Sequence, residues 1–182
     1  MGLAPKAPER AFHQAREIHG LGSGATGERK TSLKAEELLK RYKRGERNFR
    51  GAKLEGAKLR AADLEGIKLN GAILRMADLR EVRLYRADLR GANLYKADLS
   101  GADLRKCNLR GANLTKTDLS GADLRKASLH EAHLRESDLS EADLHQAKLK
   151  RANLIAAEVT EKQLARAKSL KQATLPDGTV CK

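Results

Sequence analysis

The stretch from Leu89 to Ser128 reads, in two rows of twenty residues, LRGANLYKADLSGADLRKCN and LRGANLTKTDLSGADLRKAS. Each row is built from a shorter unit of five residues: a small residue, then Asp or Asn, then Leu, then two further residues. The rows differ only at Tyr95/Thr115, Ala97/Thr117, Cys107/Ala127 and Asn108/Ser128. Because an internal repeat decides the architecture of a chain, its period is interpreted first.

The period of five is incompatible with a regular helix and with a regular strand. An α-helix turns by about 100° per residue, so leucines five apart would point in every direction. A strand alternates sides at each residue, so successive leucines would face opposite sides. A chain that runs extended for three residues and then turns a corner buries both the small residue and the Leu. The pattern therefore predicts a solenoid with a core of Leu and Ala.

A second period, of twenty residues, indicates that four units complete one coil. The residues before each Leu recur in order, although a recent duplication of twenty residues would give the same signal. Four units per coil would stack two sets of carboxylates on two different sides of the solenoid: Asp78, Asp98, Asp118 and Asp138 on one, and Asp103, Asp123 and Asp143 on another.

Stacked like charges repel unless cations compensate them. The corner positions supply the candidate cations, which are Lys96, Lys106, Lys116, Lys126, Arg105 and Arg125. The sequence therefore predicts a mixed-charge surface held together by ion pairs.

The units Ala-Asp-Leu-x-x and Ala-Asn-Leu-x-x resemble those of the pentapeptide-repeat proteins. The pattern runs from Phe49 to Leu154, with 22 central residues spaced five apart. The resemblance implies an all-β fold, a right-handed quadrilateral parallel β-helix, with short helical caps at both ends. Five to six coils stacked at roughly 4.8 Å would form a rod about 26 Å long.

Four segments are predicted along the chain. Residues 1–31 form a flexible N-terminal extension, which is a native tail, a targeting segment or an added leader. Residues 32–47 form a capping helix, with Thr31 or Ser32 as its N-cap and Gly45 as its end. Its apolar stripe consists of Leu33, Leu38, Leu39 and Tyr42.

Residues 48–159 form the repeat region, and residues 160–182 form a C-terminal helix and cap. The run from Thr160 to Gln163 is typical of a capping box, which opens a helix that ends near Lys168. The following Ala173-Thr174-Leu175 returns to the spelling of the repeat, and Pro176 begins a turn. A cap is expected at each end because an open coil exposes unpaired backbone groups.

The formal net charge of +13 is distributed along the chain. Residues 1–47 carry a net +5, residues 48–158 another +5, and the remaining residues +3. Charge that is spread in this way favours solubility and a mild attraction to polyanions over one dedicated site.

The densest basic cluster is a candidate binding site. It consists of Lys40, Arg41, Lys43, Arg44, Arg47 and Arg50. These residues either provide favourable charge at the C-terminus of a helix or contact phosphates or an acidic partner.

No catalytic, cofactor or metal site is predicted. The period of twenty places His130, His133 and His145 on different sides or around a corner, and the column of Ser100, Ser120 and Ser140 has no neighbouring base. The two cysteines do not indicate a disulfide framework, because Cys107 takes an inward position and Cys181 is next to the C-terminus.

Four outward apolar residues share one side and could form a small contact patch: Ile73, Met76, Tyr95 and Ile155. Only two tyrosines, Tyr85 and Tyr95, lie in the repeat, and the period places them on opposite sides. A nucleic-acid surface with aromatic residues among cations is therefore not indicated by the sequence.

The sequence favours a non-enzymatic scaffold that mediates protein–protein interaction with an unknown partner. One alternative is a basic protein that binds nucleic acid or an anionic membrane surface; another is a homodimer formed through a capped end. The family resemblance adds a DNA mimic that binds a topoisomerase, a role that requires an acidic rod and conflicts with this basic chain. There is no apolar run long enough for a membrane span and no secretory signal, so the expected location is the cytoplasm.

Overall fold

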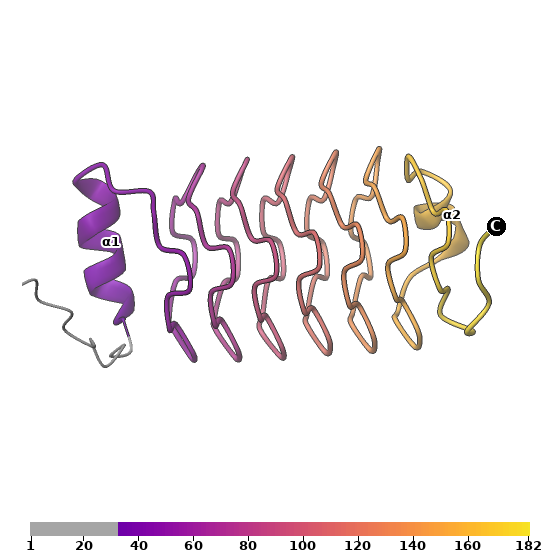
Figure 1. The fold of residues 1–182 in the computed structure, drawn as a ribbon, viewed down its shortest axis with the longest axis horizontal. Helices are drawn as coiled ribbons and strands as arrows, with labels where there is room; N and C mark the ends of the chain where they lie inside the picture. Colours follow the sequence, from indigo (N-terminus) through magenta and orange to yellow (C-terminus); the bar gives the residue numbers. More distant parts are fainter. Residues whose placement is uncertain (1–32) are drawn as a thin grey trace, which may run out of the picture.

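The repeat region is a row of stacked coils (Figure 1), and parallel backbone bridges join residues that are twenty apart along it. The computed structural model describes residues 33–182, so the predicted extension and the candidate N-caps Thr31 and Ser32 lie outside the described residues. The bridges begin with Asn48 and Lys68 and continue to Asp138 and Glu158. Four units of five therefore complete one coil, as the second period predicted.

The bridging residue is always the outward one before the central Leu. Its backbone N–H donates to the previous coil and the N–H of the Leu donates to the next, as in Asn93 N to Ala72 O (2.9 Å) and Leu94 N to Asn113 O (2.8 Å). A corner follows directly, so the bridges are isolated and no continuous strand forms in the described residues.

The corners require an unusual backbone conformation. The second corner residue of each unit has positive φ, 61° at Gly91 and 56° at Lys96. Glycine adopts this conformation without strain, whereas a residue with a Cβ does so at a cost of roughly 1 kcal/mol. Many corners nevertheless carry long side chains, which the corner projects outward.

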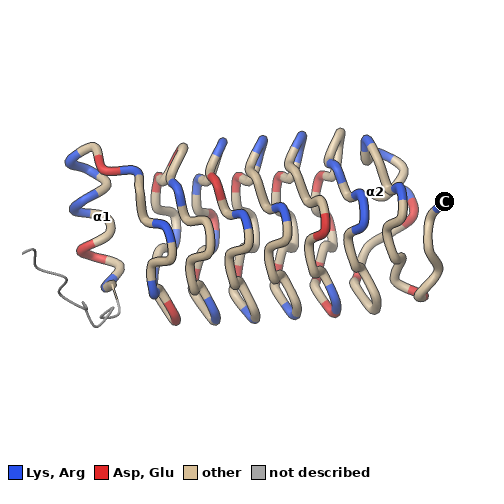
Figure 2. The backbone as a smooth tube through the Cα atoms, in the orientation of Figure 1, with Lys and Arg blue, Asp and Glu red and all other residues tan. Residues whose placement is uncertain are grey.

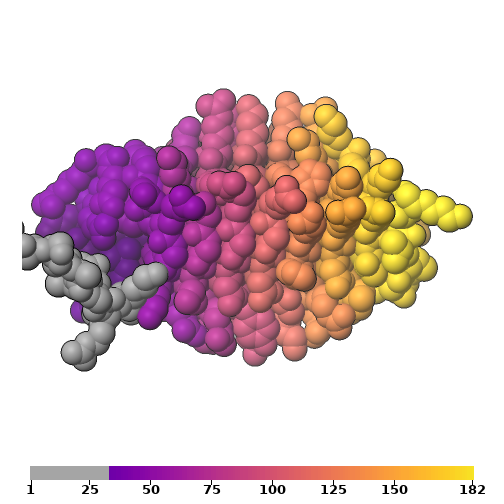
Figure 3. All heavy atoms as spheres, in the orientation of Figure 1, coloured from indigo at the N-terminus to yellow at the C-terminus, as the bar shows by residue number. Residues whose placement is uncertain are grey.

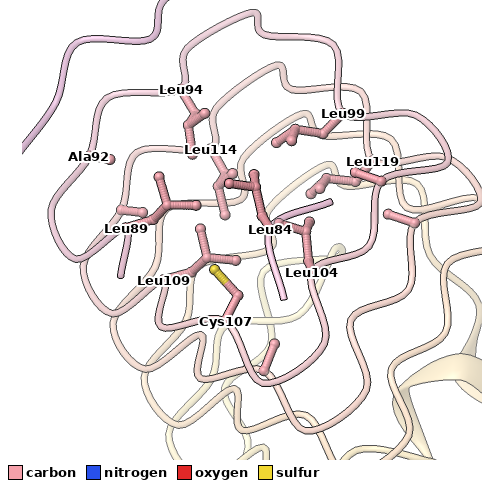
Figure 4. Close-up of a cluster of buried hydrophobic side chains, with 14 of the residues drawn as sticks. Leu84, Leu89, Ala92, Leu94, Leu99, Leu104, Cys107, Leu109, Leu114 and Leu119 are labelled. Atoms are coloured by element: carbon pink, nitrogen blue, oxygen red, sulfur yellow. The ribbon is translucent and has the colours of Figure 1, made fainter. Parts of the chain in front are cut away.

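The core is a stack of leucines flanked by small residues (Figure 4). Leu89, Leu94, Leu99 and Leu104 point inward from the four successive sides of a coil, and all are fully buried. Alanine dominates the other inward position because four walls converge on a narrow interior. The buried hydroxyl of Thr117 donates to the carbonyl of Leu94 (2.8 Å), so this polar substitution is satisfied by the backbone.

Helix α1 (Ala35–Lys43) covers the first coil and is shorter than the predicted segment 32–47. Leu38 is fully buried, and Leu33, Leu39 and Tyr42 pack against the core. The N-cap is Lys34 and not Thr31 or Ser32. The helix begins late because the N–H of Leu33 still donates to Lys53 O of the first coil (2.9 Å). Gly45 has φ of 94° and directly follows the C-cap residue.

Helix α2 (Glu161–Leu164) has the predicted capping box between Thr160 and Gln163. It ends at Leu164 and not near Lys168. The helix stops because the chain must return to the coil, where Lys168 N donates to Ala147 O (2.8 Å). Thr174 then bridges Asn153, as the repeat spelling predicted.

The C-terminal turn closes the opposite end of the rod from α1 (Figure 1). Gly178 N donates to Leu175 O (3.0 Å), which confirms the turn that begins at Pro176. Within residues 33–182, no helix has both the length and the apolar character needed to span a bilayer.

Candidate interaction surfaces

Each coil presents four faces, which we number by their central residues. Face 1 has central residues 49, 69, 89, 109, 129 and 149; face 2 those from 54 to 154; face 3 those from 59 to 159; and face 4 those from 64 to 144, each at intervals of twenty. A face includes the outward residue before each centre and the two corner residues after it. Faces 1 and 3 are separated by two corners in either direction, as are faces 2 and 4.

The balance of charge in residues 48–158 differs from face to face; Figure 2 marks the Lys, Arg, Asp and Glu positions along the coils. Face 1 carries seven Lys or Arg and two Asp or Glu, a net +5, and face 2 carries five Lys or Arg and two Asp or Glu, a net +3. Face 3 carries three Lys or Arg and seven Asp or Glu, a net −4, and face 4 carries six Lys or Arg and five Asp or Glu, a net +1. The rod therefore has a basic face and an acidic face on opposite sides.

Beside the central leucines of face 4, arginines and aspartates neutralise one another in ion pairs. Arg105 donates to Asp103 in its own unit (2.6 Å) and lies 3.5 Å from Asp123 in the next coil. Arg125 repeats this pattern with Asp123 and Asp143. The hydrogen bond from Arg105 lowers the pKa of Asp103. The predicted compensation by Arg105 and Arg125 is thus confirmed, and so are the two predicted aspartate columns.

The lysines at the corners do not compensate the aspartates. Lys106 donates to the hydroxyl of Tyr85 (3.1 Å), Lys116 pairs with Glu136 (3.2 Å), and Lys96 lies over the ring of Tyr95. Lys106 and Lys116 thus reach residues of a neighbouring coil, and Lys96 contacts a ring in its own unit. That part of the prediction is wrong.

Face 3 has an acidic column that is only partly compensated. Arg80 pairs with Asp78 (2.7 Å) and approaches Asp98 (3.6 Å), and its hydrogen bond lowers the pKa of Asp78 to about 2. Within residues 33–182, Asp118 and Asp138 have no cationic partner. The hydroxyl of a serine two residues along donates to Asp98 and to Asp118.

Face 1 keeps most of its positive charge. Arg90 pairs with Asp88 (2.7 Å) and Arg110 with Glu131 (3.1 Å). The remaining Lys and Arg of this face form no ion pair within the described chain: Arg50, Lys68, Lys148, Lys150 and Arg151. Burial and then the neighbouring Lys148, Arg110 and Lys150 lower the pKa of His130, which reflects the positive field at this face.

The corner between face 4 and face 1 is also basic. Arg86, Lys106 and Lys126 occupy the same corner position in successive coils. Tyr85 lies beside this row, with the guanidinium carbon of Arg86 5.0 Å from its ring centroid. The hydrogen bond from Lys106 lowers the pKa of Tyr85.

The basic cluster predicted from the sequence divides into two groups. Arg41 and Arg47 hold the cap in place: Arg41 makes two hydrogen bonds to the carboxylate of Glu46, and Arg47 lies 3.8 Å from the centroid of the Tyr42 ring. The members with no such contact are Lys40, Lys43, Arg44 and Arg50, all of which are exposed, as Arg47 is too. Of these, Arg50 is the first residue of the column on face 1 that continues to Arg90 and Arg110.

Face 2 carries the apolar residues that the sequence singled out, but they do not form one patch. Ile73 and Met76 lie in one coil and Tyr95 in the next, where Met76 N donates to Tyr95 O (3.0 Å). Ile155 lies three coils farther along the same face. The side chain of Met76 is 51% exposed. The face 2 patch is therefore Ile73, Met76 and Tyr95.

A hollow with a volume of about 1010 Å³ lies between α1 and the first coil, in the part of the rod coloured indigo in Figure 3. Leu39 and Tyr42 of α1 line one side, and Leu59 and Ala62 line the other. Its rim mixes cations and carboxylates, of which Asp63 is paired with Arg83 (2.8 Å). The residues that line it contain no nucleophile beside a base.

The remaining candidate residues lie apart from one another. His130, His133 and His145 belong to faces 1, 2 and 4, so they do not converge. Cys107 is fully buried, its thiol donates to Ala87 O (3.3 Å), and burial raises its pKa. Cys107 thus packs in the core, as its inward position predicted. The opposite placement of Tyr85 on face 4 and Tyr95 on face 2 also agrees with the period.

Comparison with known proteins identifies the repeat. The family model described as pentapeptide repeats matches residues 48–86, 83–121 and 117–154, with eight copies. No curated protein sequence matches the chain significantly.

Several solved structures are similar. Rfr23 from the cyanobacterium Cyanothece 51142 is 29% identical over 79% of this chain and 97% of its own, with a TM-score of 0.47. HetL from Nostoc sp. strain PCC 7120 is 30% identical over 81% of this chain and 99% of its own, with a TM-score of 0.29. A pentapeptide repeat protein of the Arabidopsis thaliana thylakoid lumen is 22% identical over 73% and 83%, with a TM-score of 0.40.

Proposed function

Since the chain belongs to the pentapeptide-repeat family, we propose that it is a non-enzymatic scaffold, a right-handed quadrilateral β-helix that binds a partner protein through face 2. The observation that carries this proposal is the face 2 patch. Among the described residues, only Met76 and Val180 are large apolar side chains that are mostly exposed, and Val180 belongs to the C-terminal cap.

The backbone at Met76 supports a role for this side chain outside the core. Met76 occupies a left-handed corner with φ of 53°, where glycine would be the unstrained choice. Its side chain gains little burial in exchange, because half of it remains exposed to solvent. Contact with a partner would give the side chain the burial that the isolated rod does not provide.

The surroundings of the patch define the chemistry of the partner. Tyr95 lies between two cations, with Arg75 5.6 Å and Lys96 5.5 Å from its ring centroid. Methionine and tyrosine are enriched at protein interfaces, and the polar rim sets the electrostatic complement. The best-fitting partner has an apolar depression bordered by carboxylates.

A capture experiment tests the proposal with the full chain immobilised. The patch variant is Met76→Gly/Tyr95→Ser, and the matched control is Val180→Ser, which removes the other mostly exposed apolar side chain. We expect a protein from native cell extract that the wild type and the control retain and the patch variant does not. Retention of the same proteins by all three would contradict binding through face 2.

A further inference from the structure

Two rows of basic residues, which include one histidine, run side by side along the rod where face 4 meets face 1. The corner row consists of Arg86, Lys106 and Lys126, and the face row consists of Arg90, Arg110, His130 and Lys150. Both rows advance by one residue per coil, a step of about 4.8 Å. We call these seven residues the basic strip.

Small neutral residues separate the two rows. Asn108 and Ser128 lie between them in the middle coils, and the one carboxylate there is Asp88. Lys126 and Lys150 have no carboxylate partner within the described chain, and Lys106 is held by the hydroxyl of Tyr85. The ion pairs of Arg90 and Arg110 are exposed, so each contributes at most about 1 kcal/mol and is readily exchanged for another anion.

We propose that the basic strip binds the backbone phosphates of a nucleic-acid duplex. A straight, evenly spaced row of cations suits a polymer with evenly spaced negative charges, and long Lys and Arg side chains absorb the difference in spacing. Asn and Ser side chains between the rows donate to phosphate oxygens in many complexes. Contacts of this kind go to phosphates and not to base edges, so the basic strip binds the duplex without reading its sequence.

Other partners fit the basic strip less well. Single-stranded binding relies on several exposed rings for base stacking, whereas the one ring here, Tyr85, is already in contact with Arg86 and Lys106. Membrane binding relies on apolar insertion, and neither mostly exposed large apolar residue lies on face 1. Face 3 of a second copy has the opposite charge, but face-to-face stacking would continue from copy to copy without closing.

The proposed function concerns face 2, so the two surfaces are tested independently. If the basic strip makes four to six phosphate contacts, a plot of the logarithm of the association constant for the duplex against the logarithm of the salt concentration should have a slope of about −4 to −5. Between 50 and 200 mM salt the affinity should fall by roughly 10²–10³-fold.

The experiment measures anisotropy of a labelled 20-base-pair DNA duplex over a salt series. The strip variant is Lys106→Gln/Lys126→Gln/Lys150→Gln. The matched control, Lys58→Gln/Lys96→Gln/Lys162→Gln, removes the same charge elsewhere. A third variant, Lys40→Gln/Lys43→Gln/Arg44→Gln, tests the exposed cap cluster.

We expect the strip variant to bind the duplex at least tenfold more weakly at 50 mM salt, with a slope reduced by about 2–3. The control and the cap variant should stay within threefold of the wild type. In the wild type, bound duplex should also raise the pKa of His130, which an NMR titration measures.

Four results would overturn the proposal. The first is an equal loss of duplex affinity in the strip variant and the control. The second is tighter binding of single strands or of phosphatidylserine vesicles than of the duplex. The third is a loss of duplex affinity only in the cap variant. The fourth is salt-sensitive self-association, measured by sedimentation, that excess duplex does not reverse. Circular dichroism of each variant confirms that the rod has folded before binding is compared.

Discussion

Faces 4 and 1 carry nearly the same number of cations, six and seven, but five of the seven on face 1 form no ion pair, against three of the six on face 4, all of them at the corner toward face 1. The difference lies in the residue before the central Leu. On face 4 this residue is Asp at 103, 123 and 143, and Arg two positions later binds it at the first two of these. On face 1 the matching residues after Asp88 are Asn108, Ser128 and Lys148.

One position in the five-residue unit therefore decides whether a face neutralises itself. The ion pairs of the repeat region join residues of the same face, either within one unit or between adjacent coils. Because these pairs do not cross a corner, an excess of charge on one face is not cancelled by its neighbours. A rod of nearly uniform backbone can thus present four different electrostatic surfaces.

The largest expected effect tests whether the two faces differ only on the outside. Leu104→Ala on face 4 and Leu109→Ala on face 1 should each lower the free energy of unfolding by about 2–5 kcal/mol, since both leucines are fully buried among rigid neighbours. Urea denaturation followed by circular dichroism measures both. Costs that differ by more than about 1.5 kcal/mol between the two sites would show that the faces also differ inside.

The next prediction converts face 1 into the pattern of face 4. Asn108→Asp/Ser128→Asp places a carboxylate two residues before Arg110 and His130, in the geometry by which Asp88 binds Arg90. We expect duplex affinity to fall at least tenfold, because the new carboxylates pair with the strip and repel phosphates. The matched control is Asn93→Asp/Asn113→Asp on face 2, which should change the affinity less than threefold. Equal effects would contradict the localisation.

A smaller effect concerns the acid stability of face 4. The hydrogen bond from Arg105 lowers the pKa of Asp103, so its stabilisation is complete above the ordinary carboxyl pKa near 3.8 and is lost as pH falls toward the lowered value. Asp103→Asn should therefore destabilise the protein at pH 7, by about 1 kcal/mol or less, and the gap should narrow below pH 4. Urea midpoints at pH 7 and pH 3 measure the gap. A gap that stays constant with pH would show that the ion pair is not its source.

The solenoid, its coil length and its columns could be predicted from the sequence, because burial imposes both periods. The period of twenty correctly placed Asp98 over Asp78 and Tyr85 opposite Tyr95. The start of α1 and the end of α2 could not be predicted, since they depend on hydrogen bonds to distant coils. Leu33 is held by Lys53, and Lys168 is held by Ala147.

The difference in net charge between the four faces can be read from the sequence, but a sum of charge over consecutive residues hides it. Every twenty residues cross all four faces, so the differences between the faces average out in such a sum. Residues that share a position in the coil must be summed instead, and the period of twenty alone then aligns Arg50, Arg90 and Arg110. By contrast, the hydrogen bond from Lys106 to Tyr85 depends on the direction in which a left-handed corner projects its side chain. The order of residue types in the repeat does not reveal this direction.

The smallest expected effect separates stability from binding at the face 2 patch. Met76→Gly should raise the free energy of unfolding by about 0.5–1 kcal/mol, because glycine removes the strain of the left-handed corner and little burial is lost. A rise of about 2–4 °C in Tm is the corresponding signal. Lys126→Gly, at the equivalent corner beside face 1 with φ of 60°, should stabilise the rod equally while weakening duplex binding. If Met76→Gly did not raise the free energy of unfolding, the methionine side chain would contribute more to the stability of the rod than its exposure indicates. The main argument for a partner protein at face 2 would then fail.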